Sequence, residues 1–293
     1  IPTNLRYAIS VGIGMFIAFI GLKNAGIIVA NPATYVGLGK FTPTSVLGII
    51  AIVLSGVLMA RKVKGSLFIG IVIATVVGIP LGVTQISEGW LPVSAPNSLA
   101  PVFCKFDFSG LFNFRMIVVI FSLLLVNIFD TVGTLVGLAD KSGITRPDGT
   151  IPRVKEAMMS DAIGTTCGAC LGSSTITTYV ESASGMAEGG RSGLTAFVVG
   201  VLFLVSLFLS PLFLLIPGAA TSGALVMVGV LMIGSVKNIE LNDISEAFPA
   251  FITMITMVLC YSISDGICLG ILSYVLVKLC TGKYKQVTPT LLV

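Results

Sequence analysis

The stretch MIVVIFSLLLVNIFDTVGTLVGLA, residues 116–139, decides the class of fold. Its one charged side chain is Asp130, and the other residues are apolar or small and polar. A helix of about 20 apolar residues is long enough to cross the ~30 Å hydrocarbon core of a bilayer. Residues 116–139 are therefore predicted to form a membrane-spanning helix with a single carboxylate near its middle.

Comparable apolar runs recur along the chain. Of its 293 residues, 55% are hydrophobic and 10% are charged, whereas soluble domains carry about 25% charged residues. This composition excludes an ordinary soluble domain and predicts an all-α polytopic membrane protein. The expected spans cover residues 5–22, 46–60, 66–83, 116–139, two spans within 194–236 divided by Pro211 and Pro217, 251–262 and 266–279.

Basic residues cluster in short loops at positions 61–64, 141–155 and 278–285, and the net charge of the chain is +4. Short loops rich in Lys and Arg lie on the cytoplasmic side of a membrane, so all three clusters are expected there. They describe topology and do not indicate binding of nucleic acid. Loop 84–114, which carries few charges, is then expected on the outer side. Residues 238–248 are expected to form an amphipathic helix at the cytoplasmic interface.

Metal and cofactor chemistry find little support in the sequence. The chain has six cysteines and no histidine. Cys167 and Cys170 form one CxxC pair, but no second pair completes a metal site, so small buried side chains are favoured for both. We therefore expect no metal site and no cofactor. Any proton chemistry near neutral pH falls to carboxylates.

Asp130 is the first candidate functional residue. Asn127, Asp130, Thr131 and Thr134 follow helical spacing and share one face, while the opposite face is apolar. A charged side chain at the bilayer centre costs at least ~2.5–3.5 kcal/mol, so such residues face a cavity or a partner and usually mark function. The alternative is that Asp130 is a hydrogen-bonded strut between two helices. The length of the polar stripe favours a functional role.

The second candidate region is SSTITTYVESASGMAEGG, residues 173–190. Irregular backbone at membrane depth occurs where protein buries it or where it lines a cavity, and transporters use such broken helices to bind ligands. A short extended segment followed by a half-helix is expected within 173–187. A half-helix that starts near Thr178 would place Glu181 in its first turn. The alternative is a simple helix-start acid, favoured by the helix dipole.

Asp161 leaves two interpretations open. Ser160 and Asp161 open the short apolar segment DAIGTTCGACLG, where Ser160 could cap a helix. A role for Asp161 in a proton network is equally consistent with the sequence.

The chain resembles the nucleobase/cation symporter-2 family, and within it the AzgA-like adenine, guanine and hypoxanthine permeases. The resemblance rests on FDTVGT (129–134) and STITTYVESASG (174–185), together with GIGMFIAFIGLKNAGIIV (12–29). It implies fourteen membrane segments in two inverted repeats of seven, with a core domain that moves against a dimerising gate domain. The chain begins Ile-Pro-Thr-Asn rather than with Met. We expect about the first four segments of the family pattern to be missing.

The resemblance also implies a domain division and a function. Residues 1–83 would be gate helices of the first repeat, 84–114 an extracytoplasmic loop, 115–216 the core of the second repeat, and 217–293 its gate helices. The function would be proton-coupled uptake of a purine nucleobase across the cytoplasmic membrane by an elevator-type mechanism. A homodimer through the gate domain, H⁺ as the coupling ion and no cofactor are implied. An enzymatic activity is not.

Family site residues carry over onto matching positions of this chain. The pocket carboxylates fall on Asp130 and Glu181, and Asp161 is the further acid of the proton-coupling set. The substrate-binding residues implied by the resemblance are Asp130, Thr131, Thr134, Tyr179, Val180 and Glu181.

Three other functions fit the sequence less well. An intramembrane aspartyl protease also needs two membrane carboxylates, but its Gly-x-Gly-Asp signature requires a Gly-Asp dipeptide, which the chain lacks. An anion or organic-acid transporter of related fold would favour a basic residue in the pocket rather than two acids. A purely structural membrane subunit would explain neither polar region.

Overall fold

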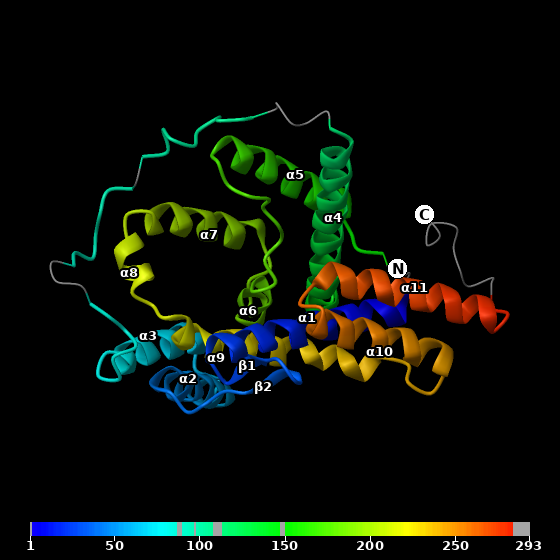
Figure 1. Cartoon of the computed structure of the whole chain (residues 1–293), viewed down its shortest axis with the longest axis horizontal. Helices are drawn as coiled ribbons and strands as arrows, with labels where there is room; N and C mark the ends of the chain where they lie inside the picture. Colours follow the sequence, from blue (N-terminus) through cyan, green and yellow to red (C-terminus); the bar gives the residue numbers. More distant parts are fainter. Residues whose placement is uncertain (1, 87–89, 97, 108–112, 147–149, 284–293) are drawn as a thin grey trace. The chain divides into compact units, whose positions relative to one another are not determined.

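A computed structural model describes residues 2–86, 90–96, 98–107, 113–146 and 150–283. Within these residues the chain is mostly helical (Figure 1). The elements are α1 Thr3–Asn24, β1 Ile28–Asn31, β2 Tyr35–Leu38, α2 Pro43–Ala60, α3 Ser66–Gly78, α4 Phe114–Ser142, α5 Val154–Cys170, α6 Ser182–Ala187, α7 Gly193–Ser206, α8 Ser210–Leu214, α9 Gly218–Ile233, the 3₁₀ helix η1 Gly234–Asn238, α10 Ile244–Leu259 and α11 Ile263–Cys280.

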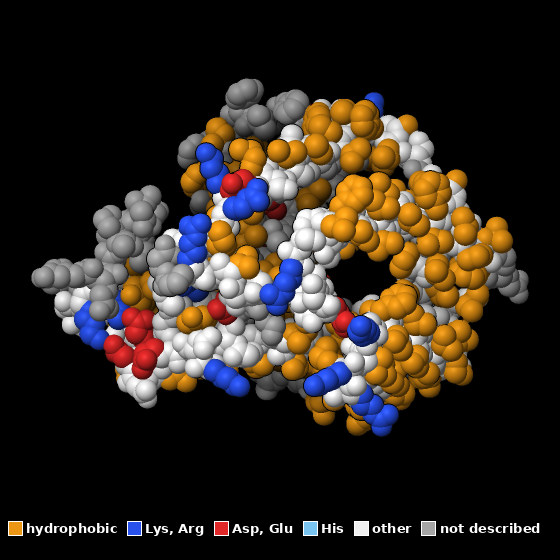
Figure 2. Space-filling view, turned by 180° about the vertical axis from the view of Figure 1, so that it is seen from behind, with side chains coloured by type: hydrophobic (Ala, Val, Ile, Leu, Met, Phe, Trp, Pro, Cys, Tyr) orange, Lys and Arg blue, Asp and Glu red, His pale blue; other side chains and the backbone are white. Residues whose placement is uncertain are grey.

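The expectation of a polytopic helical membrane protein is confirmed. In the part of the chain that the structure describes, four helical stretches are long and apolar enough to cross a membrane: Thr3–Asn24, Pro43–Ala60, Gly218–Asn238 and Ile263–Cys280. Apolar side chains also remain on the surface. Helix α7 has no buried residue, and Figure 2 shows broad hydrophobic surfaces with few charges. Such surfaces suit contact with lipid, because hydrocarbon tails replace water there.

The expectation of an all-α fold is wrong in one place. Strands β1 and β2 form an antiparallel hairpin in which Ile28 pairs with Leu38 and Asn31 with Tyr35. The sequence around Asn31-Pro32 instead predicts a hydrophobic loop. The hairpin turn depends on a local bond from the Ala33 backbone N–H to Asn31 Oδ1 at 2.9 Å, which is the Asx-type geometry that starts turns.

Two compact units make up the chain. One comprises residues 1–16, 98–182 and 232–293, and the other comprises residues 17–97 and 183–231. The first unit holds α4, α5, α10 and α11, and the second holds α2, α3 and α7. The predicted division into gate and core segments remains a prediction.

Small residues allow close helix packing in each unit. In the second unit, Gly223 of α9 lies so close to Ala51 of α2 that a side chain there would meet the Ala51 backbone. In the first unit, α10 and α11 form a neighbouring pair (Figure 1) in which Gly266 and Gly270 contact Met257 and Thr253, respectively. Small residues let helix backbones approach, which increases dispersion contact where no hydrophobic drive exists.

Several helix boundaries differ from the sequence expectation. Residues 238–248 form no single amphipathic helix, because η1 ends at Asn238 and α10 begins only at Ile244. The N-cap of α10 is Asp243, which accepts a hydrogen bond from the Ser245 backbone N–H at 2.9 Å. Capping by Asp fixes this start, since it satisfies an otherwise unpaired donor.

Candidate functional site

Helix α4 buries its second half and exposes its first. Met116, Ile120 and Leu124 are exposed, whereas Thr131 and Thr134 are 0% and 3% exposed. The predicted helix over 116–139 is confirmed within the longer helix Phe114–Ser142. Because both threonines are buried, the polar stripe faces packed protein rather than lipid.

Two glycines bring neighbouring helices against this buried half. At Gly137, an added Cβ would lie 3.6 Å from the Ser10 backbone of α1, and at Gly133 it would meet Ile267 of α11. Gly133 and Gly137 form a GxxxG pattern, which permits this close approach of neighbouring helices. The polar stripe of α4 is held between α1 and α11.

Asp130 is held in place by α11. Ser264 Oγ donates a hydrogen bond to Asp130 Oδ1 at 2.7 Å. Ser264 lies in the first turn of α11, whose N-cap is Ser262. The Asp265 backbone N–H donates to Ser262 Oγ. Sequence reasoning missed Ser264, and the only local signal was a serine in the first turn of an apolar helix.

Asp161 faces α4 rather than a helix end. Thr131 Oγ1 donates to Asp161 Oδ2 at 3.1 Å, which joins α4 to α5. Helix α5 begins at Val154, seven residues before Asp161, and its N-cap is Arg153. The capping role considered for Ser160 is therefore wrong. Thr131, the residue directly after Asp130, is thus the contact that connects α4 to Asp161.

The irregular segment after α5 is anchored to that helix. Residues 173–179 are neither helix nor strand. Thr165 of α5 donates to the Ile176 carbonyl at 2.9 Å and accepts from the Ile176 backbone N–H at 3.3 Å. The Ile176 side chain packs over Gly168, where a Cβ would approach it to 2.8 Å. A single threonine thus satisfies both backbone groups of an otherwise unpaired residue, as membrane depth requires.

The end of this segment carries the remaining predicted residues. Val180 is buried, whereas Tyr179 is 61% exposed and Glu181 is also exposed. Helix α6 begins at Ser182, so Glu181 precedes the half-helix instead of lying in its first turn. The expected start near Thr178 is wrong by about one turn.

Hydrogen bonds thus link the three elements that carry the predicted site. Thr131 connects α4 to Asp161 of α5, and Thr165 connects α5 to the segment before Glu181. The proximity of Asp130 and Glu181 themselves stays a prediction, as do the substrate roles of Thr134, Tyr179 and Val180.

Asn127 adds a polar atom that lacks a partner. Its Oδ1 is buried and accepts no hydrogen bond from the described residues. Asn127 lies one turn before Asp130 and Thr131 on the same face of α4. A buried amide oxygen without a donor costs about 1–3 kcal/mol, so this position is suited to a ligand that brings an N–H group.

Comparison with known proteins places the chain. A family model described as "Permease family" matches residues 1–269. The chain belongs to this permease family. It is 46% identical to a putative permease of Methanocaldococcus jannaschii, over 98% of this chain and 66% of that protein. It is 44% identical to the adenine permease AdeP of Escherichia coli, over 100% of this chain and 65% of AdeP. It is 41% identical to the guanine/hypoxanthine permease PbuO of Bacillus subtilis, over 100% of this chain and 68% of PbuO.

The permease family confirms the resemblance drawn from the sequence. Relatives carry the names of adenine and of guanine/hypoxanthine permeases, which indicates a transporter rather than an intramembrane protease. The chain spans about two thirds of the length of the curated relatives that it matches.

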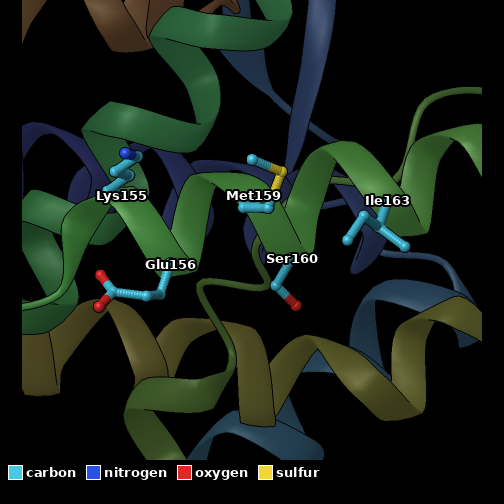
Figure 3. Close-up of a pocket in the computed structure, with 5 residues that line it drawn as sticks. All are labelled: Lys155, Glu156, Met159, Ser160 and Ile163. Carbon is cyan, nitrogen blue, oxygen red and sulfur yellow. The ribbon is translucent and has the colours of Figure 1, made fainter.

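A surface depression lies along α5 of this permease-family chain. Its volume is about 550 Å³, and the lining residues that the structure describes belong to α5 (Figure 3): Lys155, Glu156, Met159, Ser160 and Ile163. In Figure 3, Lys155 points away from Glu156 and Ser160. None of the predicted site residues is among these described lining residues, and the described lining, which comes from one helix, provides no convergent set of polar groups such as ligand sites have.

Proposed function

We propose that the protein takes up a purine nucleobase (adenine, guanine or hypoxanthine) across the cytoplasmic membrane together with protons. The observation that carries the proposal is the buried polar stripe of α4 in a chain whose relatives are named as purine permeases. We assign the stripe, with Asp161 and residues 179–181, to the substrate and coupling site.

The stripe fits the chemistry of a purine. A purine edge presents N–H donors beside ring-nitrogen acceptors, and a carboxylate oxygen pair together with an amide oxygen can accept several donors. Ser264 fixes the orientation of the Asp130 carboxylate, and Asn127 offers a buried acceptor one turn away. A site built in this way rejects analogues that lack the donor, because its own polar atoms would stay unpaired.

Proton coupling is assigned to Asp130, Glu181 and Asp161. Carboxylates near one another in a poorly solvated site hold a proton more readily than carboxylates in water. Thr131, the residue after Asp130, donates to Asp161, so a proton on Asp161 would change the hydrogen bond that this acid makes with α4. The coupling ion would be H⁺, with no further cofactor.

Transport would proceed by an elevator-type movement of a core domain against a gate domain. Within the family layout, residues 115–216 belong to the core, while residues 1–83 and 217–293 supply gate helices and the homodimer contact. Helix α4 would then change its position along α1 and α11, where Gly133 and Gly137 leave little side-chain bulk to obstruct it.

Uptake of radiolabelled purines by proteoliposomes tests the function. We expect accumulation of at least one of adenine, guanine and hypoxanthine under an inward proton gradient, and its collapse on addition of a protonophore. Asp130→Asn and Glu181→Gln should abolish accumulation. Wild-type accumulation by either variant would reject the coupling role of that residue. Uptake of an organic anion that added purines do not inhibit would reject a purine as the substrate class.

A further inference from the structure

Two cysteines far apart in sequence are backbone neighbours in the first compact unit. The Cys104 backbone N–H donates to the Cys170 carbonyl at 2.8 Å. Cys104 belongs to the loop before α4, and Cys170 is the last residue of α5. Cys104 is exposed and Cys170 is half-buried. Cys167, one turn earlier in α5, is exposed as well, so the expectation that the CxxC residues are buried is wrong.

A second contact packs the loop before α4 against the C-terminal end of α5. Gly172 has a positive φ of +80°, and a Cβ there would approach Val102 Cβ to 2.7 Å. Residues 99–105 form a compact turn in which the backbone N–H groups of Val102 and Phe103 both donate to the Leu99 carbonyl. The Cys104–Cys170 neighbourhood is therefore part of a packed contact rather than a chance approach of two side chains.

The backbone contact is close enough for a disulfide to be considered. The single N–H···O=C bond of 2.8 Å brings the two backbones about as near as neighbouring strands of a sheet, which lie about 4.7–4.9 Å apart, and disulfides require Cα separations of about 4.4–6.8 Å. We propose that Cys104 and Cys170 form a redox-sensitive disulfide that fastens the loop before α4 to the end of α5.

Both cysteines are expected on the outer side of the membrane. The loop carrying Cys104 lies between spans and is sparse in charge, whereas α5 starts beside the basic loop 141–155 and ends at Cys170. The loop before α4 and the end of α5 are thus both predicted to lie on the side of the membrane opposite the basic loops. Disulfides persist in such extracytoplasmic compartments.

The bond would form by exchange with an oxidised dithiol carrier. The Cys104 thiolate attacks the disulfide of the carrier and forms a mixed disulfide, and one carrier thiolate leaves. The Cys170 thiolate then attacks the Cys104 sulfur, releases the second carrier thiolate and closes the Cys104–Cys170 bond. The permease loses two electrons and two protons, and the carrier ends as a dithiol.

The bond would restrict the helix that carries part of the proposed site. Helix α5 bears Asp161, and through Thr165 it holds the segment that leads to Glu181. If transport requires α5 to move relative to the loop before α4, oxidation slows uptake. This consequence rests on the proposed function, whereas the disulfide itself does not.

Peptide mapping tests the disulfide directly. Membranes that contain the protein are treated with copper phenanthroline, the remaining thiols are blocked with N-ethylmaleimide, and the protein is digested with and without dithiothreitol. We expect a cross-linked peptide pair with Cys104 and Cys170, lighter by two hydrogen atoms than the separate thiol peptides. Cys104→Ser or Cys170→Ser should remove it, and Cys167→Ser should not. The matched control Cys260→Ser, which also removes an exposed thiol, should leave the pair intact.

Other outcomes would overturn the proposal. A pair between Cys104 and Cys167, a bond only between two copies of the chain, or Cys104 and Cys170 that are both alkylated by N-ethylmaleimide after full oxidation would each refute the assigned bond. Purine uptake by the same oxidised and reduced samples tests the consequence, with loss on oxidation and recovery after dithiothreitol expected. A formed bond with unchanged uptake refutes the restriction. Absence of purine uptake in both the oxidised and the reduced sample refutes the proposed function, and the peptide map still tests the disulfide.

Discussion

At the scale of single residues, Ser264 is the position whose importance the structure adds. It fixes the Asp130 carboxylate across 134 positions of sequence. Hydrogen bonds to charged groups contribute about 1.5–3 kcal/mol. We therefore expect Ser264→Ala to weaken purine uptake by roughly tenfold or more, because every 1.4 kcal/mol is tenfold in an equilibrium constant. Uptake kinetics in proteoliposomes measure the change.

Ser262→Ala is the matched control for this prediction. Ser262 caps the same helix, with its Oγ accepting from the Asp265 backbone N–H at 3.2 Å. Loss of an N-cap costs about 0.5–2 kcal/mol of stability without removing the bond to Asp130. The control should lower the melting temperature and leave the apparent affinity near wild type. Equal affinity losses in both variants would assign the effect to helix α11 as a whole.

What the sequence could predict at this scale follows from how local each signal is. Asp130 stands out because one charge interrupts an apolar run. Ser264 and Asp161 could not be assigned partners, because their bonds join helices that no short-range pattern connects. Asn127 was visible on the polar face, but its unpaired oxygen is a property of the packed structure.

At the scale of elements, the α10–α11 pair is joined by a buried cation. Lys278 is 1% exposed, and its Nζ lies 2.5 Å from Glu246 Oε1 and 3.0 Å from Ser245 Oγ. Breaking a buried ion pair by removing one partner typically costs about 3–5 kcal/mol, since the other charge remains uncompensated. We expect Lys278→Met to lower the melting temperature in detergent strongly. The double variant Lys278→Met/Glu246→Gln should recover part of the loss.

Lys283→Met provides the control, because the same helix pair carries an exposed ion pair nearby. Lys283 Nζ lies 2.6 Å from Asp243 Oδ2, and both side chains are about two-fifths exposed. This bond and the Ser245 backbone N–H hold the pKa of the Asp243 carboxyl below its usual value. The stabilisation of the fold by the Asp243 carboxylate is thus present above the pKa that this group has in the unfolded chain. It is lost as the pH falls through the lower pKa of the group in the folded chain. Lys283→Met should change stability little; a loss as large as that of Lys278→Met would contradict the role of burial.

Glycines in two apolar helices give an opposite pair of predictions. Gly200 of α7 has open space where a Cβ would stand, whereas at Gly223 of α9 a Cβ would meet the Ala51 backbone. Alanine in a helix interior is more favourable than glycine by about 0.5–1 kcal/mol. Gly200→Ala should therefore preserve or raise the melting temperature, and Gly223→Ala should lower it. Equal effects of the two substitutions would refute the close packing of α9 on α2.

Element boundaries show where sequence signals are weak. The apolar run of α4 is long and uniform, so its helix was found. The start of α5 was missed because its first residues include Lys155 and Glu156, which resemble a loop. The β1–β2 hairpin was missed because its strands are four residues each and its turn depends on the Asn31 side chain.

At the scale of the whole molecule, energy coupling should be separable from substrate binding. Asp161 is reached from the substrate stripe through Thr131, so we assign it to proton transfer rather than to direct purine contact. Asp161→Asn keeps a side chain that can still accept the Thr131 hydrogen bond but cannot exchange a proton. We expect this variant to exchange labelled for unlabelled purine and to fail in accumulation driven by a proton gradient.

Asp140→Asn is the matched control for coupling. Asp140 lies near the end of the same helix α4, where it accepts a hydrogen bond from Ser235, and Ser235 in turn contacts Ser10 of α1 at 3.4 Å. That cluster joins α4 to its neighbours outside the proposed site, so Asp140→Asn should retain gradient-driven accumulation even where the rate falls. Accumulation by Asp161→Asn equal to that of wild type would remove Asp161 from the coupling set. Loss of accumulation in both variants alike would show that neutralising either acid uncouples transport, and the Thr131–Asp161 bond would then have no special part in it.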